Sequence, residues 1–136
     1  MTVFMFPGQG AQKPGMGADL LGIAEVARTF AIAGEVCGVD VAALAREGSA
    51  EQGNDAYNAQ VLAAALSVGL SHALDARGIQ AEAMLGFSLG QISALMASGV
   101  LSDEDGFALL DVRARSMAQA CKERPGAMYA LLGAAH

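Results

Sequence analysis

Apolar residues along the chain fall into short unbroken runs and into longer stretches with helical spacing. The short runs at 2–6 (TVFMF) and 84–87 (MLGF) do not alternate with polar residues, which is typical of buried parallel strands. The longer stretches predict helices, and the closing GAMYALLG predicts a third strand over 126–133. The predicted helices cover residues 23–37, 41–46, 60–76, 89–98 and 103–122.

Polar and glycine residues mark the ends of these elements. The loop PGQGAQKPGMG stops the first strand, and its glycines would let the backbone approach a ligand closely. Gly38 ends the first helix, and EGSAEQGNDAYN is predicted to be a polar connection. Ser102 is a predicted N-cap, followed by three acids that suit the helix dipole. Because no linker divides the chain, we expect one α/β domain over residues 1–136.

Composition and charge exclude several classes of partner and site. The formal net charge is -6, which argues against nucleic acid as a partner. The longest apolar run, residues 61–74, is shorter than the roughly 20 residues of a membrane span. Two distant cysteines without metal-ligand spacing predict no metal site and a reduced, cytoplasmic protein. The first ten residues lack the basic start of a signal peptide.

The segment LGFSLGQ contains the pattern Gly-x-Ser-x-Gly between a predicted strand and a predicted helix. This arrangement is the nucleophile elbow of the α/β-hydrolase-like folds. Gly86 and Gly90 would leave room for the tight turn, and the turn would expose the hydroxyl of Ser88. The helix that begins at Leu89 would direct free N–H groups toward a developing oxyanion. The pattern therefore predicts Ser88 as a nucleophile, although a pentapeptide of this kind also occurs by chance.

A nucleophilic serine needs a base, and the chain has two histidines. His72 lies within the apolar stretch 60–76, which predicts a core or interface histidine. His136 is the last residue, and a catalytic base at a chain terminus is not expected. The residues alone thus predict a nucleophile without a convincing base.

Three stretches together resemble the malonyl-CoA:acyl carrier protein transacylases, the acyltransferase family of fatty acid and polyketide synthesis. These stretches are FPGQGAQKPGMG, GFSLGQISALMASGVLS and VRARSMAQACKERPGAMYALLG. Their order and spacing follow the family's FPGQGSQ, GHSLGE and Arg-x-x-x-Met segments. The resemblance covers the whole chain but only the first half or less of a family member. It implies the N-terminal part of an acyltransferase fold that ends near the start of a ferredoxin-like subdomain.

The resemblance also implies roles for individual residues. Ser88 would accept the acyl group, and the backbone N–H groups of Gln9 and Leu89 would form the oxyanion hole. Arg113 would pair with the malonyl carboxylate, for which a planar guanidinium is well suited. Gln60 would line the pocket. Without the resemblance, Arg113 would be read as a solvated helix residue and Gln9 as an ordinary loop residue.

The implied reaction transfers malonyl from coenzyme A to the phosphopantetheine thiol of an acyl carrier protein through a malonyl-serine, as part of fatty acid biosynthesis. Coenzyme A thioester is then the substrate, and no cofactor is implied. Two residues depart from the family pattern: Phe87 stands in place of the usual His, and Gln91 in place of Glu. We expect Phe87 to alter pocket packing more than chemistry.

The family's catalytic histidine lies beyond the stretch that this chain matches, which leaves three interpretations. The chain is an N-terminal portion that needs a C-terminal piece, a non-catalytic remnant that binds acyl or pantetheine groups or a carrier protein, or a generic serine hydrolase-like domain. We favour the first interpretation, because the third requires the PGQG loop and Arg113 to be coincidental. Uncovered sheet edges and apolar helix faces then predict self-association or binding to a complementing C-terminal fragment.

Overall fold

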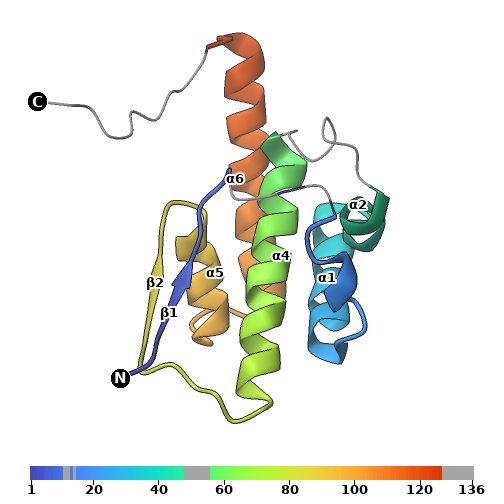
Figure 1. Ribbon diagram of the computed structural model, residues 1–136. Coiled ribbons are helices and arrows are strands. Elements are labelled where there is room, and N and C mark those ends of the chain that lie inside the picture. Colours follow the sequence, from blue (N-terminus) through green and yellow to red (C-terminus); the bar gives the residue numbers. More distant parts are fainter. Residues whose placement is uncertain (11–12, 14, 48–55, 127–136) are drawn as a thin grey trace, which may run out of the picture.

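The computed structural model describes residues 1–10, 13, 15–47 and 56–126 as two strands and a group of helices (Figure 1). The predicted third strand lies outside these residues except for Gly126. The elements, labelled as in Figure 1, are β1 (Val3–Phe6), the 3-10 turn η1 (Ala18–Leu20), α1 (Ala24–Cys37), α2 (Val41–Glu47), α4 (Ala56–Asp75), β2 (Ala83–Gly86), α5 (Gly90–Ala97) and α6 (Asp103–Glu123).

The predicted parallel sheet is confirmed. β1 and β2 are paired in parallel, with Val3 opposite Ala83 and Phe6 opposite Gly86. Parallel neighbours need a long crossover, and the helices between the two strands supply it. Because both strands run in one direction, Phe6 and Gly86 end at the same edge of the sheet, where the Gly-x-Ser-x-Gly segment follows.

The helices lie to one side of the strands, and α4 is their centre (Figure 1). It contacts α1, α2, α5 and α6, and α5 lies against both strands. Ala64, Val61 and Val68 of α4 are completely buried, as expected for a helix that is apolar nearly all round. The small residues along α4 let its neighbours pack closely on several faces, and this packing forms the core.

The helix α4 begins at Ala56, not at the predicted Gln60. The sequence Asp-Ala-Tyr-Asn is polar enough to resemble a loop, but Tyr57 is half-buried, and its hydroxyl lies 2.7 Å from the carbonyl oxygen of Cys37. This contact with the end of α1 stabilises one additional turn at the start of α4. The polar residues of the segment do not predict that turn. The predicted polar connection therefore ends earlier than residue 58, because residues 56–58 belong to α4.

The other helix ends agree with the sequence. α1 stops at Cys37, directly before Gly38. Ser102 caps α6, and its side-chain oxygen accepts a hydrogen bond from the Asp105 N–H at 3.0 Å. The acids that follow Ser102 occupy the first turn, where they stabilise the positive end of the helix dipole.

The apolar runs predicted strands that are buried on both faces. This prediction was wrong, because only one face is buried. Phe6 is buried, but Met5 is 78% exposed and its register partner Leu85 is 56% exposed. The helices cover one face of the sheet, while the opposite face bears apolar side chains that nothing in the described part of the chain covers. Parallel sheets normally have both faces covered, so this face is incomplete as it stands. No helix among the described residues is long and apolar enough to cross a membrane.

The contact between α1 and α4 depends on Gly69, and Gly69→Ala should weaken it. A Cβ atom at this position would lie 2.9 Å from the Cα atom of Val26, which is backbone and cannot rotate away. We expect the free energy of unfolding to fall by about 1–3 kcal/mol in urea titrations, although alanine favours an isolated helix. Ser67→Ala on the same helix should change it by less than about 0.5 kcal/mol. A Gly69→Ala protein that is more stable than the native chain would contradict this packing.

Candidate active site

Ser88 lies in the tight turn between β2 and α5. Its φ angle is 51°, and among the described residues it is the one non-glycine residue with a positive φ. This left-handed conformation is strained for serine and is typical of a nucleophile elbow. The turn is held by the Gly90 N–H, which donates to the Phe87 carbonyl at 2.9 Å, and by the Gln91 N–H, which donates to the Ser88 carbonyl at 3.1 Å. The strained elbow predicted from the sequence is therefore present.

The two glycines of the motif allow three backbone segments to meet. A Cβ atom on Gly86 would lie 2.2 Å from the carbonyl carbon of Gly90, and one on Gly90 would lie 2.1 Å from the carbonyl oxygen of Phe6. Phe6 also accepts a hydrogen bond from the Phe87 N–H at 3.1 Å. The end of β1, the end of β2 and the start of α5 are thus in direct backbone contact, as the expected role of the glycines requires.

The PGQG loop lies beside this elbow. A Cβ atom on Gly8 would lie 2.8 Å from Cδ1 of Phe87 and 3.2 Å from its carbonyl oxygen, so the loop backbone packs against the residue that precedes Ser88. Gln9 follows directly in the chain and is exposed, whereas the Leu89 side chain is fully buried at the start of α5. Both candidate oxyanion-hole residues are adjacent to the turn. Their role as N–H donors stays a prediction.

Arg113 and Gln60 join Ser88 in one hydrogen-bonded group. Arg113 of α6 donates from Nη2 to Ser88 Oγ at 3.1 Å and from Nη1 to Gln60 Oε1 of α4. The Gln60 side chain is completely buried, and its Nε2 donates to the Ala56 carbonyl at 3.1 Å. Three residues chosen from three separate sequence segments are thus in contact. The guanidinium of Arg113 thus lies next to the candidate nucleophile, and its role in recognising an acyl carboxylate stays a prediction.

Phe87, which replaces the family's usual histidine, projects to the surface. The residue is 77% exposed, and one edge of its ring lies against the Gly8 backbone. The residue therefore contributes to the outer wall of the elbow, and its expected effect on pocket packing stays a prediction. Together with Met5 and Leu85 it extends the uncovered apolar surface of the sheet up to the candidate site.

His72 is not placed to act on Ser88. Its Nε2 lies 3.1 Å from both carboxylate oxygens of Asp103, at the start of α6. Ser88 contacts the same helix at Arg113, which is ten residues further along the sequence and thus about 15 Å away at 1.5 Å per residue. The side chain is 36% exposed and paired with a carboxylate of α6, so of the two alternatives, a core or an interface histidine, the fully buried one is wrong. His136 lies outside the described residues.

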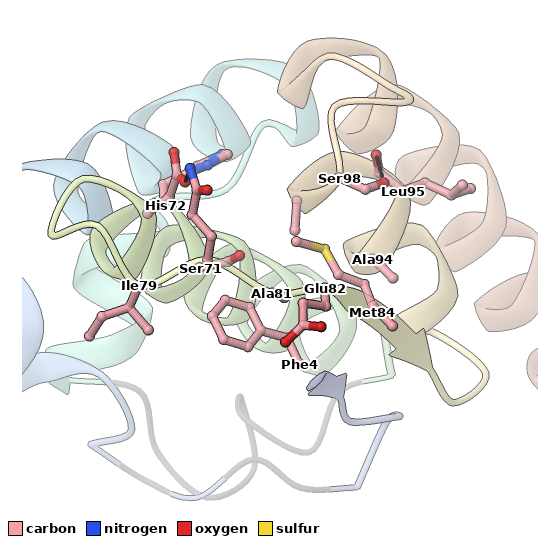
Figure 2. Close-up of a pocket in the computed structure, with 14 residues that line it drawn as sticks. Phe4, Ser71, His72, Ile79, Ala81, Glu82, Met84, Ala94, Leu95 and Ser98 are labelled. Carbon is pink, nitrogen blue, oxygen red and sulfur yellow. Dashed lines mark hydrogen bonds between the residues drawn. The ribbon is translucent and has the colours of Figure 1, made fainter. Parts of the chain in front are cut away.

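The cavity that His72 lines is at the other end of the strands (Figure 2). It has a volume of about 490 Å³ and is bordered by Phe4, Glu82 and Met84, with Ser98 from the end of α5. Neither Ser88 nor Arg113 borders it. Sites in parallel α/β sheets lie beyond the carboxyl ends of the strands, which is where Ser88 is found. We therefore assign the chemistry to the elbow and not to this cavity.

A polar network next to Gln60 and Arg113 was not foreseen from the sequence. The Tyr57 hydroxyl contacts Asp111 Oδ1 as well as the Cys37 carbonyl, and Arg115 Nε donates to Asp111 Oδ2 at 2.8 Å. The Arg115 guanidinium also lies 5.0 Å from the centre of the Tyr57 ring. The network ties α1, α4 and α6 together at the level of the site. The i, i+4 spacing of Asp111 and Arg115 is the one feature of the sequence that could have predicted part of this network.

This network controls the ionisation of its members. The hydrogen bond from Arg115 lowers the pKa of the Asp111 carboxyl, while burial and then the hydrogen bond to Asp111 raise the pKa of the Tyr57 hydroxyl. Burial is the largest cause that raises the pKa of Cys37 to about 11, so its thiol is neutral near pH 7. Cys37 and Cys121 are both free thiols. Among the described residues, no three His, Cys, Asp or Glu side chains are grouped to hold a metal ion.

A serine on a strand–turn–helix elbow is the geometry of α/β proteins that transfer acyl groups through a serine. Comparison with known families agrees with this class. The acyl transferase domain family matches residues 3–135, and the chain belongs to that family. The resemblance predicted from the three motifs is thereby confirmed.

Individual relatives are longer than this chain. Malonyl CoA-acyl carrier protein transacylase of Escherichia coli K12 is 39% identical over 132 residues, which are 96% of this chain and 43% of that protein. An acyl carrier protein S-malonyltransferase structure from Vibrio cholerae superimposes with a TM-score of 0.81 at 38% identity, over 88% of this chain and 40% of that one. The structure of a type II PKS acyl carrier protein in complex with its malonyl-transacylase gives a TM-score of 0.81 at 36% identity. The match covers 88% of this chain and 39% of that chain. The chain thus corresponds to the N-terminal portion of these relatives and spans about two fifths of their length.

Replacing Gly90 with alanine should disrupt the elbow. The added Cβ atom would overlap the Phe6 carbonyl oxygen, so β1 and α5 would have to separate. We expect the free energy of unfolding to fall by about 3 kcal/mol or more in denaturant titrations. Gln91→Ala, at the next and exposed position, should change it by less than about 0.5 kcal/mol. Equal stability of the Gly90→Ala protein and the native chain would show that the close backbone contact is not required.

Asp111→Asn should reduce the loss of stability in acid. The pKa of Asp111 is lowered in the folded chain, so its contribution to stability is present above the unfolded value of about 3.9 and is lost as the pH falls through the folded value. Between about pH 5 and pH 2 the free energy of unfolding should therefore decline more in the native chain than in the variant. Urea titrations across this range measure the difference. Parallel pH profiles would mean that the Asp111–Arg115 contact is not maintained in solution.

Proposed function

We propose that this chain is the nucleophile-bearing part of an acyltransferase that moves a malonyl group from coenzyme A to the phosphopantetheine thiol of an acyl carrier protein, in fatty acid biosynthesis. The observation that carries the proposal is the hydrogen bond from Arg113 to Ser88 Oγ. It places a cation suited to the free carboxylate of the acyl group next to the atom that would attack its thioester. The names of the relatives support this substrate pair.

The proposed reaction has two half-reactions at Ser88. In the first, Oγ attacks the thioester carbonyl, the carbon–sulfur bond breaks, and coenzyme A leaves as a thiol with the serine proton. In the second, the carrier-protein thiol attacks the malonyl-serine ester, the ester carbon–oxygen bond breaks, and the thiol proton passes to Oγ of Ser88. Backbone N–H groups at Gln9 and Leu89 would stabilise the tetrahedral oxyanion. We propose that neither step uses a metal or a redox cofactor.

The proton transfers need a base, and no histidine among the described residues lies near Ser88. We propose that a further acyltransferase segment supplies it and packs on the uncovered apolar surface, which includes Met5, Leu85 and Phe87. Leu109 and Val112 on the outer side of α6 are also exposed, at 48% and 65%, and would extend the contact. We further propose a reducing, cytoplasmic location, which the two free thiols support.

The reaction is tested with malonyl-CoA and acyl carrier protein, with and without the C-terminal portion of an acyltransferase relative. Intact-protein mass spectrometry should detect a malonyl adduct on the native chain once the C-terminal portion is present, and none on Ser88→Ala. Sedimentation should detect a complex of one copy of each polypeptide. If malonyl-CoA binds but no adduct or transfer forms under either condition, the chain is a non-catalytic binding domain. A homodimer that excludes the C-terminal portion would contradict the proposed partner.

Arg113→Ala should lower kcat/KM for malonyl transfer by about 10- to 100-fold in the complemented protein, because a charge-assisted pair with the substrate is lost. Transfer of acetyl, which has no carboxylate, should be retained or improved. Arg124→Ala is the matched control, since this arginine is exposed at the end of the same helix. An unchanged preference for malonyl over acetyl in the Arg113→Ala protein would remove Arg113 from the site.

A further inference from the structure

The two terminal nitrogens of Arg113 are bound to partners of different kinds. Nη1 donates to Oε1 of Gln60, whose side chain is completely buried and anchored through Nε2 to the Ala56 carbonyl. Nη2 donates to the hydroxyl of Ser88, a neutral group that can rotate about its single side-chain torsion. Gln60 therefore fixes one arm of the guanidinium, while the contact with Ser88 can be exchanged.

A substrate carboxylate would need the nitrogen that now binds Ser88. A guanidinium binds a carboxylate bidentately either end-on, through Nη1 and Nη2, or side-on, through Nε and Nη2. Nη2 carries two N–H groups, and each arrangement uses a different one of them. Ser88 therefore occupies the N–H that one of the two arrangements needs. A charge-assisted hydrogen bond is roughly twice as strong as one to a neutral hydroxyl. One methylene separates the malonyl carboxylate from the carbonyl that Ser88 would attack, so the carboxylate would approach Arg113 from the side of Ser88 and compete with Oγ for this N–H. A neutral acyl group offers nothing that could do so.

We propose that Ser88 and the carboxylate of the acyl group compete for Nη2 of Arg113, so that binding of a diacid thioester releases the nucleophile. This inference rests on the proposed function and assigns a second role to its specificity residue. While Oγ accepts from the cation, its side chain is directed toward Arg113 and part of its electron density is engaged. The strained backbone of Ser88 is fixed by the elbow, so release requires rotation of the side chain alone. A carboxylate on the acyl group would then increase the reactivity of Ser88 as well as the affinity of the chain for the thioester.

The competition predicts that removing the nucleophile tightens binding of the carboxylate. The probe is a malonyl-CoA analogue with a methylene group between the sulfur and the carbonyl, which cannot acylate Ser88. Isothermal titration should give an affinity about 2- to 10-fold higher for Ser88→Ala than for the native chain, the effect of losing one neutral hydrogen bond. The matching acetyl analogue should bind both proteins equally. Ser88→Gly, which tolerates the positive φ without strain, should give the same gain.

Ser116→Ala is the matched control, because Ser116 is exposed on the same helix as Arg113 and its hydroxyl donates to the Val112 carbonyl at 2.8 Å. It should bind the malonyl analogue with native affinity. Equal or weaker binding by both Ser88 variants would overturn the competition and leave the proposed function standing, since the native chain would still bind. Absence of binding by the native chain and by all variants in the presence of the C-terminal portion would remove both.

Discussion

The candidate site depends on the backbone contact among Phe6, Gly86 and Gly90. At this point the two parallel strands end and α5 begins, with no side chain between them. Any bulkier residue would separate the strand from the helix, and the turn could no longer hold Ser88 at a φ of 51°. The strain at the nucleophile is therefore maintained by packing elsewhere, which is how such conformations persist at functional sites.

The second requirement is that α4 and α6 stay in register, because each contributes one partner to the group around Ser88. Gln60 and Arg113 meet only if the two helices are fixed along their length, and two polar contacts do this. His72 and Asp103 join the helices at one end, and the Tyr57–Asp111–Arg115 network joins them beside the site. The His72–Asp103 pair and the Tyr57–Asp111–Arg115 network thus both stabilise the arrangement of the helices around the site.

The uncovered sheet face connects the fold to the function. Met5, Leu85 and Phe87 are apolar and exposed, and this surface reaches the elbow itself. A parallel sheet open on one face is unusual for a stable domain, and here the open face adjoins a nucleophile without a nearby base among the described residues. Under the proposed function, one added segment would both cover the apolar surface and supply the missing base.

The order and pattern of the apolar runs determined the α/β class and the parallel strands. The cap at Ser102 and the Gly-x-Ser-x-Gly elbow were also determined by the sequence itself, because each depends on residues that are close together in the chain. Family motifs added Gln60 and Arg113, which no local spacing could have chosen. Only the tertiary structure decided that α4 starts at Ala56, that His72 pairs with Asp103, and that one strand face is open. These features depend on contacts between distant segments, and the hydrogen bond that joins Arg113 to Ser88 is of the same kind.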